Sequence, residues 1–121
     1  MLKYEGRITA VGPLAGEFVD AGILVFFGLS APEELAEFAI LHDGAQLHAA
    51  VTAGDRIRLD GHTYRVLAVG DIANGNLERL GHLVVKFNGQ TEPEMPGDVC
   101  VEAKVLPPIG VGMRFAIESG D

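Results

Sequence analysis

The pattern of apolar and polar residues along the chain predicts a series of short β-strands. Side chains alternate between apolar and polar from Leu2 to Ala10 and from Arg56 to Leu59, as in strands with one buried face. Continuous apolar runs at Ile23–Phe27 and Leu67–Val69 are typical of strands covered on both faces. Alternation returns between Met113 and Glu118. We therefore expect roughly six to nine short strands.

Turn-forming sequences separate these strands at intervals of about eight to twelve residues. Asp43-Gly44, Asp60-Gly61 and Asn88-Gly89 favour tight hairpins, because these residues tolerate positive φ angles. The stretch from Gly16 to Gly22 is rich in turn formers and predicts a connection. Such a chain is mainly β and closes most readily as a small antiparallel β-barrel, closed or partly open, because closure removes unpaired edges. A β-sandwich is the competing architecture.

One or two short helices are expected beside the strands. Ser30 can cap the first of them and Pro32 suits its first turn. Leu35 and Phe38 would then face the core. A second short helix fits between Asp71 and Gly81, although turn-forming residues in its middle would interrupt it.

The composition narrows the classes of function. The formal net charge of −8 excludes nucleic acid and anionic lipid as partners, because both are bound largely through Lys and Arg. No apolar run reaches the roughly 20 residues of a membrane helix, and the N-terminus lacks the features of a secretory signal. The lone cysteine, Cys100, excludes an internal disulfide and suits a reducing compartment. We expect a cytoplasmic protein with one domain spanning residues 1–121.

His42 is the best candidate for chemistry. It could be a partly buried histidine that seals one end of a barrel, or a nucleophile, since neutral imidazole attacks well near neutral pH. His82, at the start of a predicted strand, could donate a hydrogen bond to a phosphoryl oxygen or simply bond to the backbone. His48 and His62 have no special context. The histidines lack the spacing of metal ligands, and no phosphate-binding glycine loop is present.

Two segments match a known pattern: residues 31–42, which end in His42, and residues 68–82, which end in His82. The first is Ala31-Pro32-x-x-Leu35-x-Glu37-Phe38-x-x-x-His42, and the second is Ala68-Val69-Gly70-x-x-Ala73-x-x-Asn76-Leu77-x-x-Leu80-Gly81-His82. Shorter matches lie at His62-x-Tyr64, Phe87-x-Gly89 and Glu94-x-Pro96-Gly97. The chain resembles the glucitol/sorbitol-specific enzyme IIA component of the bacterial phosphoenolpyruvate-dependent sugar phosphotransferase system (PTS).

This resemblance implies a small cytoplasmic β-barrel that carries a phosphoryl group on histidine. The group would come from the phosphocarrier protein HPr and pass to a IIB domain, which phosphorylates glucitol/sorbitol or a related polyol entering through the membrane IIC part. The resemblance places the phosphoacceptor on His42 and makes His82 the natural supporting residue. It requires no cofactor and no metal. A non-catalytic relative that binds a small ligand or a regulatory protein is the alternative.

Overall fold

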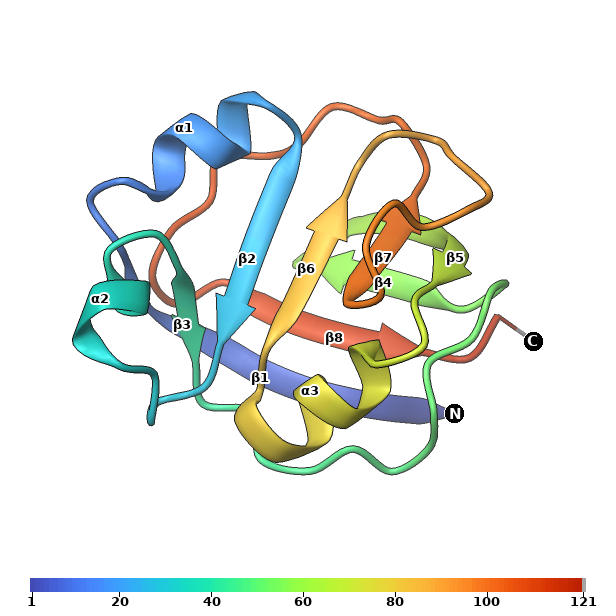
Figure 1. Cartoon of the computed structure of the whole chain (residues 1–121), viewed down its shortest axis with the longest axis horizontal. Coiled ribbons are helices and arrows are strands. Elements are labelled where there is room, and N and C mark those ends of the chain that lie inside the picture. The colour runs from blue at the N-terminus through green and yellow to red at the C-terminus, as the bar shows by residue number, and fades with distance from the viewer. Residues whose placement is uncertain (121) are drawn as a thin grey trace.

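The computed structural model describes residues 1–120, and within them eight strands close into a barrel (Figure 1). The strands follow one another around the barrel in the order β1-β3-β2-β6-β7-β5-β4-β8, and β8 pairs with β1 to close it. Two neighbouring pairs, β2 with β3 and β6 with β7, are parallel, and the others are antiparallel. The predicted barrel is confirmed, and the sandwich is not formed. The strands are β1 (Leu2–Val11), β2 (Ile23–Phe27), β3 (Ile40–His42), β4 (Arg56–Leu59), β5 (His62–Val69), β6 (Leu83–Lys86), β7 (Asp98–Val101) and β8 (Arg114–Glu118).

Three short helices lie on the outside and at the ends of the barrel: α1 (Ala15–Asp20), α2 (Glu33–Ala36) and α3 (Ala73–Leu80). The prediction of a plain connection from Gly16 to Gly22 is wrong, because α1 occupies it. The expected interruption in the middle of α3 is also absent. In both helices a buried residue, Ala15 in α1 and Leu77 in α3, packs into the core. Packing of this kind outweighs weak local helix propensity.

The predicted inward face of α2 is the clearest error in the sequence-based interpretation. Leu35 and Phe38 are 47% and 38% exposed, and Pro32, not Ser30, precedes the single helical turn. Phe38 contacts Phe18 of α1 instead, with ring centroids 5.9 Å apart. The residues that follow the turn, Ala39 and Ile40, are fully buried instead.

Side chains fill the inside of the barrel, so it is a packed core and not a channel. Phe26 and Phe115 stack at its centre, with ring centroids 4.1 Å apart and an interplanar angle of 6°. A functional group must therefore work at one end of the barrel. The largest fully buried side chains are Tyr4, Ile8, Leu24, Phe26, Ile40, Ile57, Leu59, Tyr64, Leu77, Leu83, Phe115 and Ile117.

The segment after β3 decides what surrounds the candidate histidine. Asp43-Gly44 was expected to form a hairpin, but the chain from 43 to 55 contains no helix or strand. It runs along β1, where the His48 backbone N–H donates to the Lys3 carbonyl at 2.8 Å. By contrast, Asp60-Gly61 does join the antiparallel strands β4 and β5, with Asp60 at a φ of 53°.

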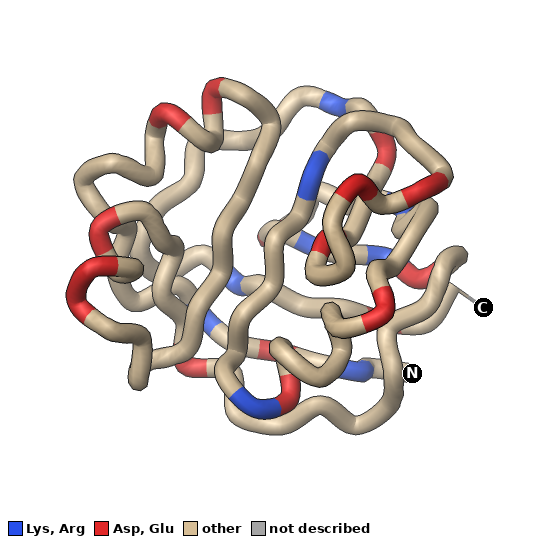
Figure 2. The backbone as a smooth tube through the Cα atoms, viewed as in Figure 1, with Lys and Arg blue, Asp and Glu red and all other residues tan. Residues whose placement is uncertain are grey.

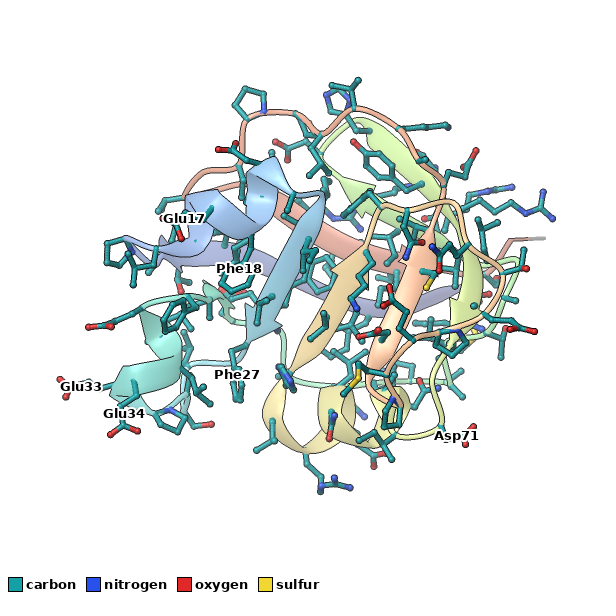
Figure 3. The ribbon with its side chains drawn as sticks, turned by 45° about the horizontal axis from the view of Figure 1, so that its top comes forward. Glu17, Phe18, Phe27, Glu33, Glu34 and Asp71 are labelled. Carbon is teal, nitrogen blue, oxygen red and sulfur yellow. The ribbon has the colours of Figure 1, made fainter. Side chains whose placement is uncertain are left out.

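Acidic residues gather on the two N-terminal helices. Figure 2 shows only red positions along α1 and α2, which carry Glu17, Asp20, Glu33 and Glu34. Figure 3 shows Glu33 and Glu34 projecting from α2 into solvent. This side of the molecule is therefore an anionic surface.

Candidate functional site

His42 is the last residue of β3 and points into the end of the barrel. It pairs with Ile8 of β1, and its exposed fraction is 0%. Three aromatic rings meet it edge-on, those of Tyr4, Phe26 and Phe115, at centroid distances of 5.7, 6.1 and 5.5 Å. The ring is more deeply buried than the partly buried position considered from the sequence.

Two glycine backbones hold the His42 ring in one orientation. The Gly44 N–H donates to Nδ1 at 3.0 Å, so Nδ1 carries the lone pair. The Nε2–H therefore donates to the Gly81 carbonyl at 2.7 Å. Both ring nitrogens are engaged, and the tautomer is defined by the backbone.

Gly81 can approach the ring this closely because it has no side chain. It ends α3 with a φ of 63°, the left-handed region that favours glycine. A Cβ atom there would lie 3.1 Å from His42 Cε1 and 2.9 Å from the Gly28 nitrogen. The end of α3 is held in place by a 3.0 Å hydrogen bond from the Gly28 N–H to the Leu80 carbonyl.

Burial keeps His42 neutral. Removal from solvent lowers the pKa of its imidazole, and the hydrogen bond to Gly81 and the charge of Asp43 oppose that shift only in part. A neutral ring with an electron pair on one nitrogen is the reactive form of a histidine nucleophile, and in His42 that pair lies on Nδ1, where it accepts the Gly44 N–H.

A surface pocket of about 340 Å³ opens above this ring. His42 forms part of its lining together with the segments 28–30 and 43–45 and the last turn of α3. Leu29 and Leu80, which are 64% and 41% exposed, give the pocket an apolar edge. Its ionisable neighbours include Asp43, Glu78 and Arg79. A buried histidine thus lies beneath an accessible, partly apolar depression.

His82 follows Gly81 directly, but its ring is directed elsewhere. Its Nδ1 lies 3.1 Å from the Phe26 carbonyl, and the ring stacks on Phe27 with centroids 4.5 Å apart. Phe27 projects from the end of β2 in Figure 3. Among the described residues, those lining the His42 pocket do not include His82. The structure brings the backbone of residue 81 to His42, while the ring of residue 82 packs against β2.

The other candidate ligands are dispersed. His48 and His62 are exposed, and Cys100 is buried in β7. Within residues 1–120, no three His, Cys, Asp or Glu side chains gather closely enough to hold a metal ion. None of the helices described in this range is long and apolar enough to span a membrane.

Sequence reasoning missed three members of the site: Tyr4, Gly44 and Gly81. Tyr4 occurs in a regular alternating strand, and Gly44 was interpreted as a turn residue. Only the motif that ends in Leu80-Gly81-His82 indicated Gly81, and the residue considered there was His82, not the glycine before it.

Comparisons with known proteins agree with this architecture. Residues 3–116 match the family model of the PTS system glucitol/sorbitol-specific IIA component. The proteins named PTS system glucitol/sorbitol-specific EIIA component from Shigella flexneri and Escherichia coli K12 are each 35% identical over 116 residues, covering 96% of this chain and 94% of theirs.

A solved structure shares the fold. The crystal structure of a PTS system IIA component from Enterococcus faecalis V583 superimposes with a TM-score of 0.77 at 21% sequence identity, covering 92% of this chain and 96% of that one. The family match and the identity to the two enterobacterial proteins extend across nearly the whole described barrel. The chain belongs to the family of PTS glucitol/sorbitol-specific IIA components.

Proposed function

We propose that His42 is the phosphoacceptor of a cytoplasmic phosphocarrier formed by residues 1–121. The observation that carries this proposal is a neutral imidazole of fixed tautomer, at the base of a pocket, in a chain of this family. Phosphoryl transfer depends mainly on positioning and on stabilising charge, so it needs little more protein machinery.

In the proposed step, HPr donates the phosphoryl group. The lone pair of one His42 nitrogen forms the new N–P bond, the N–P bond of the donor breaks, and its electron pair returns to the donor imidazole. The His42 ring loses one proton and the donor ring gains one, so both imidazoles stay neutral. A IIB domain then removes the group by the same exchange. Because both ring nitrogens are engaged, the incoming group must displace the Gly44 N–H from Nδ1, or else Nε2 must first lose its proton and its bond to the Gly81 carbonyl.

Two surface features support docking of protein partners above His42. The exposed side chains of Leu29 and Leu80 provide apolar contact area at the edge of the pocket. The acidic turn of α2, with Glu33 and Glu34, offers charge that would attract a basic partner at low salt. HPr, IIB and IIC are the expected components of the pathway, and glucitol/sorbitol or a related polyol is the expected sugar.

His82 stays a predicted supporting residue. In this structure its Nδ1 bonds to the Phe26 carbonyl, so a role at the phosphoryl group would require its ring to turn toward His42. His82→Gln tests this: a supporting role predicts slower phosphorylation of His42.

Incubation with phosphoenolpyruvate, enzyme I and HPr tests the proposal directly. Wild-type protein should acquire one adduct that is labile in acid and stable in base, as a phosphohistidine is. His42→Ala should acquire none, whereas His48→Ala, which removes an exposed histidine, should behave as wild type. An unlabelled wild-type protein, or a labelled His42→Ala variant, would overturn the assignment.

The complete burial of His42 favours a second candidate function. With both nitrogens bonded to the backbone, the ring could serve as a structural seal in a barrel that binds a small ligand or a regulatory protein. In that case wild-type protein would stay unlabelled in the same assay, and His42→Ala would lower its stability without changing any transfer rate.

A further inference from the structure

Tyr4 is the second unusual side chain at this end of the barrel. It belongs to β1, its exposed fraction is 1%, and its ring meets the His42 ring edge-on at 5.7 Å. The same ring also contacts Phe115, with centroids 6.0 Å apart. The tyrosine is therefore fixed by packing beside the candidate phosphoacceptor.

The hydroxyl of Tyr4 has no hydrogen-bond partner among the described residues. Within the described residues, every fully buried side-chain nitrogen or oxygen atom has a hydrogen-bond partner. The Tyr4 hydroxyl is therefore not fully buried. Tyr4 lines the same pocket as His42. Tyr4 therefore combines a buried ring with a hydroxyl that is free to bond to a group in the pocket it shares with His42.

Gly44 ties the two rings into one cluster. Its N–H donates to His42, and a Cβ at this position would lie 2.5 Å from Tyr4 Cε2 and 2.8 Å from its hydroxyl oxygen. The absence of a side chain at residue 44 leaves room for the tyrosine beside the pocket.

The hydroxyl has the properties of a hydrogen-bond donor at neutral pH. Burial raises the pKa of Tyr4, and the neighbouring Asp43 carboxylate raises it further. The group therefore stays protonated. A donor fixed by packing before the reaction stabilises developing negative charge without reorganisation.

We propose that the Tyr4 hydroxyl donates a hydrogen bond to a phosphoryl oxygen while the phosphoryl group is on His42. This inference rests on the proposed function of His42 and adds a phosphoryl-positioning residue to it. The tyrosine keeps its proton throughout: the bonds that form and break at phosphorus are the N–P bonds of the acceptor and the donor, and the proton exchanged is that of the two imidazole rings. The hydrogen bond anchors one oxygen of the group as the phosphorus changes partners.

Tyr64 provides a matched control, because the chain contains only two tyrosines. Tyr64 is also 1% exposed and packs on Phe87 with centroids 4.8 Å apart. Its hydroxyl, however, donates to the Val105 carbonyl at 3.0 Å. One tyrosine uses its hydroxyl within the fold, and the other has it available.

The experiment compares Tyr4→Phe and Tyr64→Phe with wild type, using phosphoenolpyruvate, enzyme I and HPr as the phosphoryl source. Tyr4→Phe should slow phosphorylation of His42 by about tenfold to a hundredfold, the usual effect of losing a hydrogen bond to a charged group. Its thermal unfolding should stay close to that of wild type. Tyr64→Phe should lower the melting temperature and leave the transfer rate unchanged.

A second measurement needs no substitution. In wild-type protein labelled with ¹³C at tyrosine Cζ, phosphorylation should shift the Tyr4 signal and leave the Tyr64 signal in place. In ³¹P spectra of the phosphorylated protein, Tyr4→Phe should raise the pKa of the phosphoryl group, because a donor to its dianion is lost. The ¹³C shift shows that the phosphoryl group lies beside Tyr4, and the ³¹P titration decides the role of the hydroxyl, because a purely structural role for Tyr4 would leave the pKa of the phosphoryl group unchanged.

The outcomes separate this inference from the proposed function. If wild-type protein takes up no phosphoryl group, the proposed function is wrong and this inference falls with it. If wild type is labelled while Tyr4→Phe keeps its rate and its ³¹P titration, only the role of Tyr4 is overturned. Equal slowing in both tyrosine variants would also overturn it, because the effect would then follow general packing.

Discussion

Two buried polar clusters lie at the two ends of the segment 43–55, and they differ in whether each polar group has a hydrogen-bond partner. At one end, Lys3 Nζ contacts the Asp55 carboxylate at 2.7 Å and the Ala50 carbonyl at 2.9 Å. The same carboxylate oxygen accepts the Thr52 N–H at 2.8 Å. At the other end, His42 bonds to two glycine backbones while the Tyr4 hydroxyl beside it has no partner among the described residues.

The difference separates scaffold from site. In the Lys3–Asp55 cluster the two charges pair with each other. Their interactions hold the segment 43–55 against β1 and the start of β4. The His42 cluster leaves one hydrogen-bond donor unused and faces a pocket. Because the Tyr4 hydroxyl is not fully buried and Tyr4 lines the pocket, this donor is available to a group that binds there.

The largest effect on stability should come from breaking the scaffold cluster. Lys3→Ala leaves the Asp55 charge buried without its partner, which costs about 3–5 kcal/mol in the free energy of unfolding. Urea denaturation measures this loss. Arg58→Ala is the control: its ion pair with Glu118 is partly exposed and is worth only about 0.2–1 kcal/mol.

The transfer rate of folded Lys3→Ala protein tests the same division between the Lys3–Asp55 cluster and the His42 cluster. At low temperature, where this variant is still folded, it should accept phosphoryl groups at the rate of wild type, because the cluster does not face the pocket. A small loss of stability in Lys3→Ala, or a slowed transfer in its folded state, would contradict the division into scaffold and site.

Much of the barrel could be predicted from the sequence because strand periodicity is local information. The alternation holds in β4 and from Tyr4 to Thr9 in β1, whereas Leu2 is exposed and Lys3 is buried. The apolar run at Ile23–Phe27 does form the strand β2. The short helices were harder. The helix α1 was missed because it depends on the packing of Ala15 and not on its own propensity, whereas α2 was expected but its contacts were not. Leu35 illustrates this: its spacing fits a buried helix face, but the turn lies outside the barrel.

The candidate site divides in the same way. His42 could be singled out because its residue type and motif are visible in the sequence. Its burial, its tautomer and its nearest neighbours could not, since Gly44 and Gly81 contribute backbone groups that no pattern of side chains reports. Tyr4 looks like an ordinary strand residue until the fold shows that its hydroxyl lacks a partner.

An intermediate loss in the free energy of unfolding is expected from Gly81→Ala, a substitution in the His42 cluster. The left-handed backbone and the crowding against His42 and Gly28 together should cost about 1–3 kcal/mol. Gly22→Ala is the control, because Gly22 also has a positive φ but its Cβ would meet only ordinary contacts at 3.8 Å or more. The difference between the two, measured by urea denaturation, reports the crowding at His42; equal losses would show that the backbone conformation alone matters.

The smallest effect should be a dependence of stability on pH that belongs to the His42 cluster. Burial lowers the pKa of His42 below its unfolded value of 6.5, so the unfolded chain binds a proton first as the pH falls. The stabilisation is complete above about pH 6.5 and is lost as the pH falls toward the folded pKa. Between about pH 7 and pH 5, wild type should therefore lose more stability than His42→Gln, whose side chain does not titrate.

Urea denaturation between about pH 7 and pH 5, with His48→Gln as control, shows whether His42 is harder to protonate in the folded chain than in the unfolded chain. His48 is exposed, so its replacement should leave the pH dependence of wild type intact. If His42→Gln keeps that dependence too, the ring must gain its proton as easily in the folded state as in the unfolded one. The pocket above it would then admit water to the imidazole, and the two polar clusters would differ in accessibility as well as in pairing.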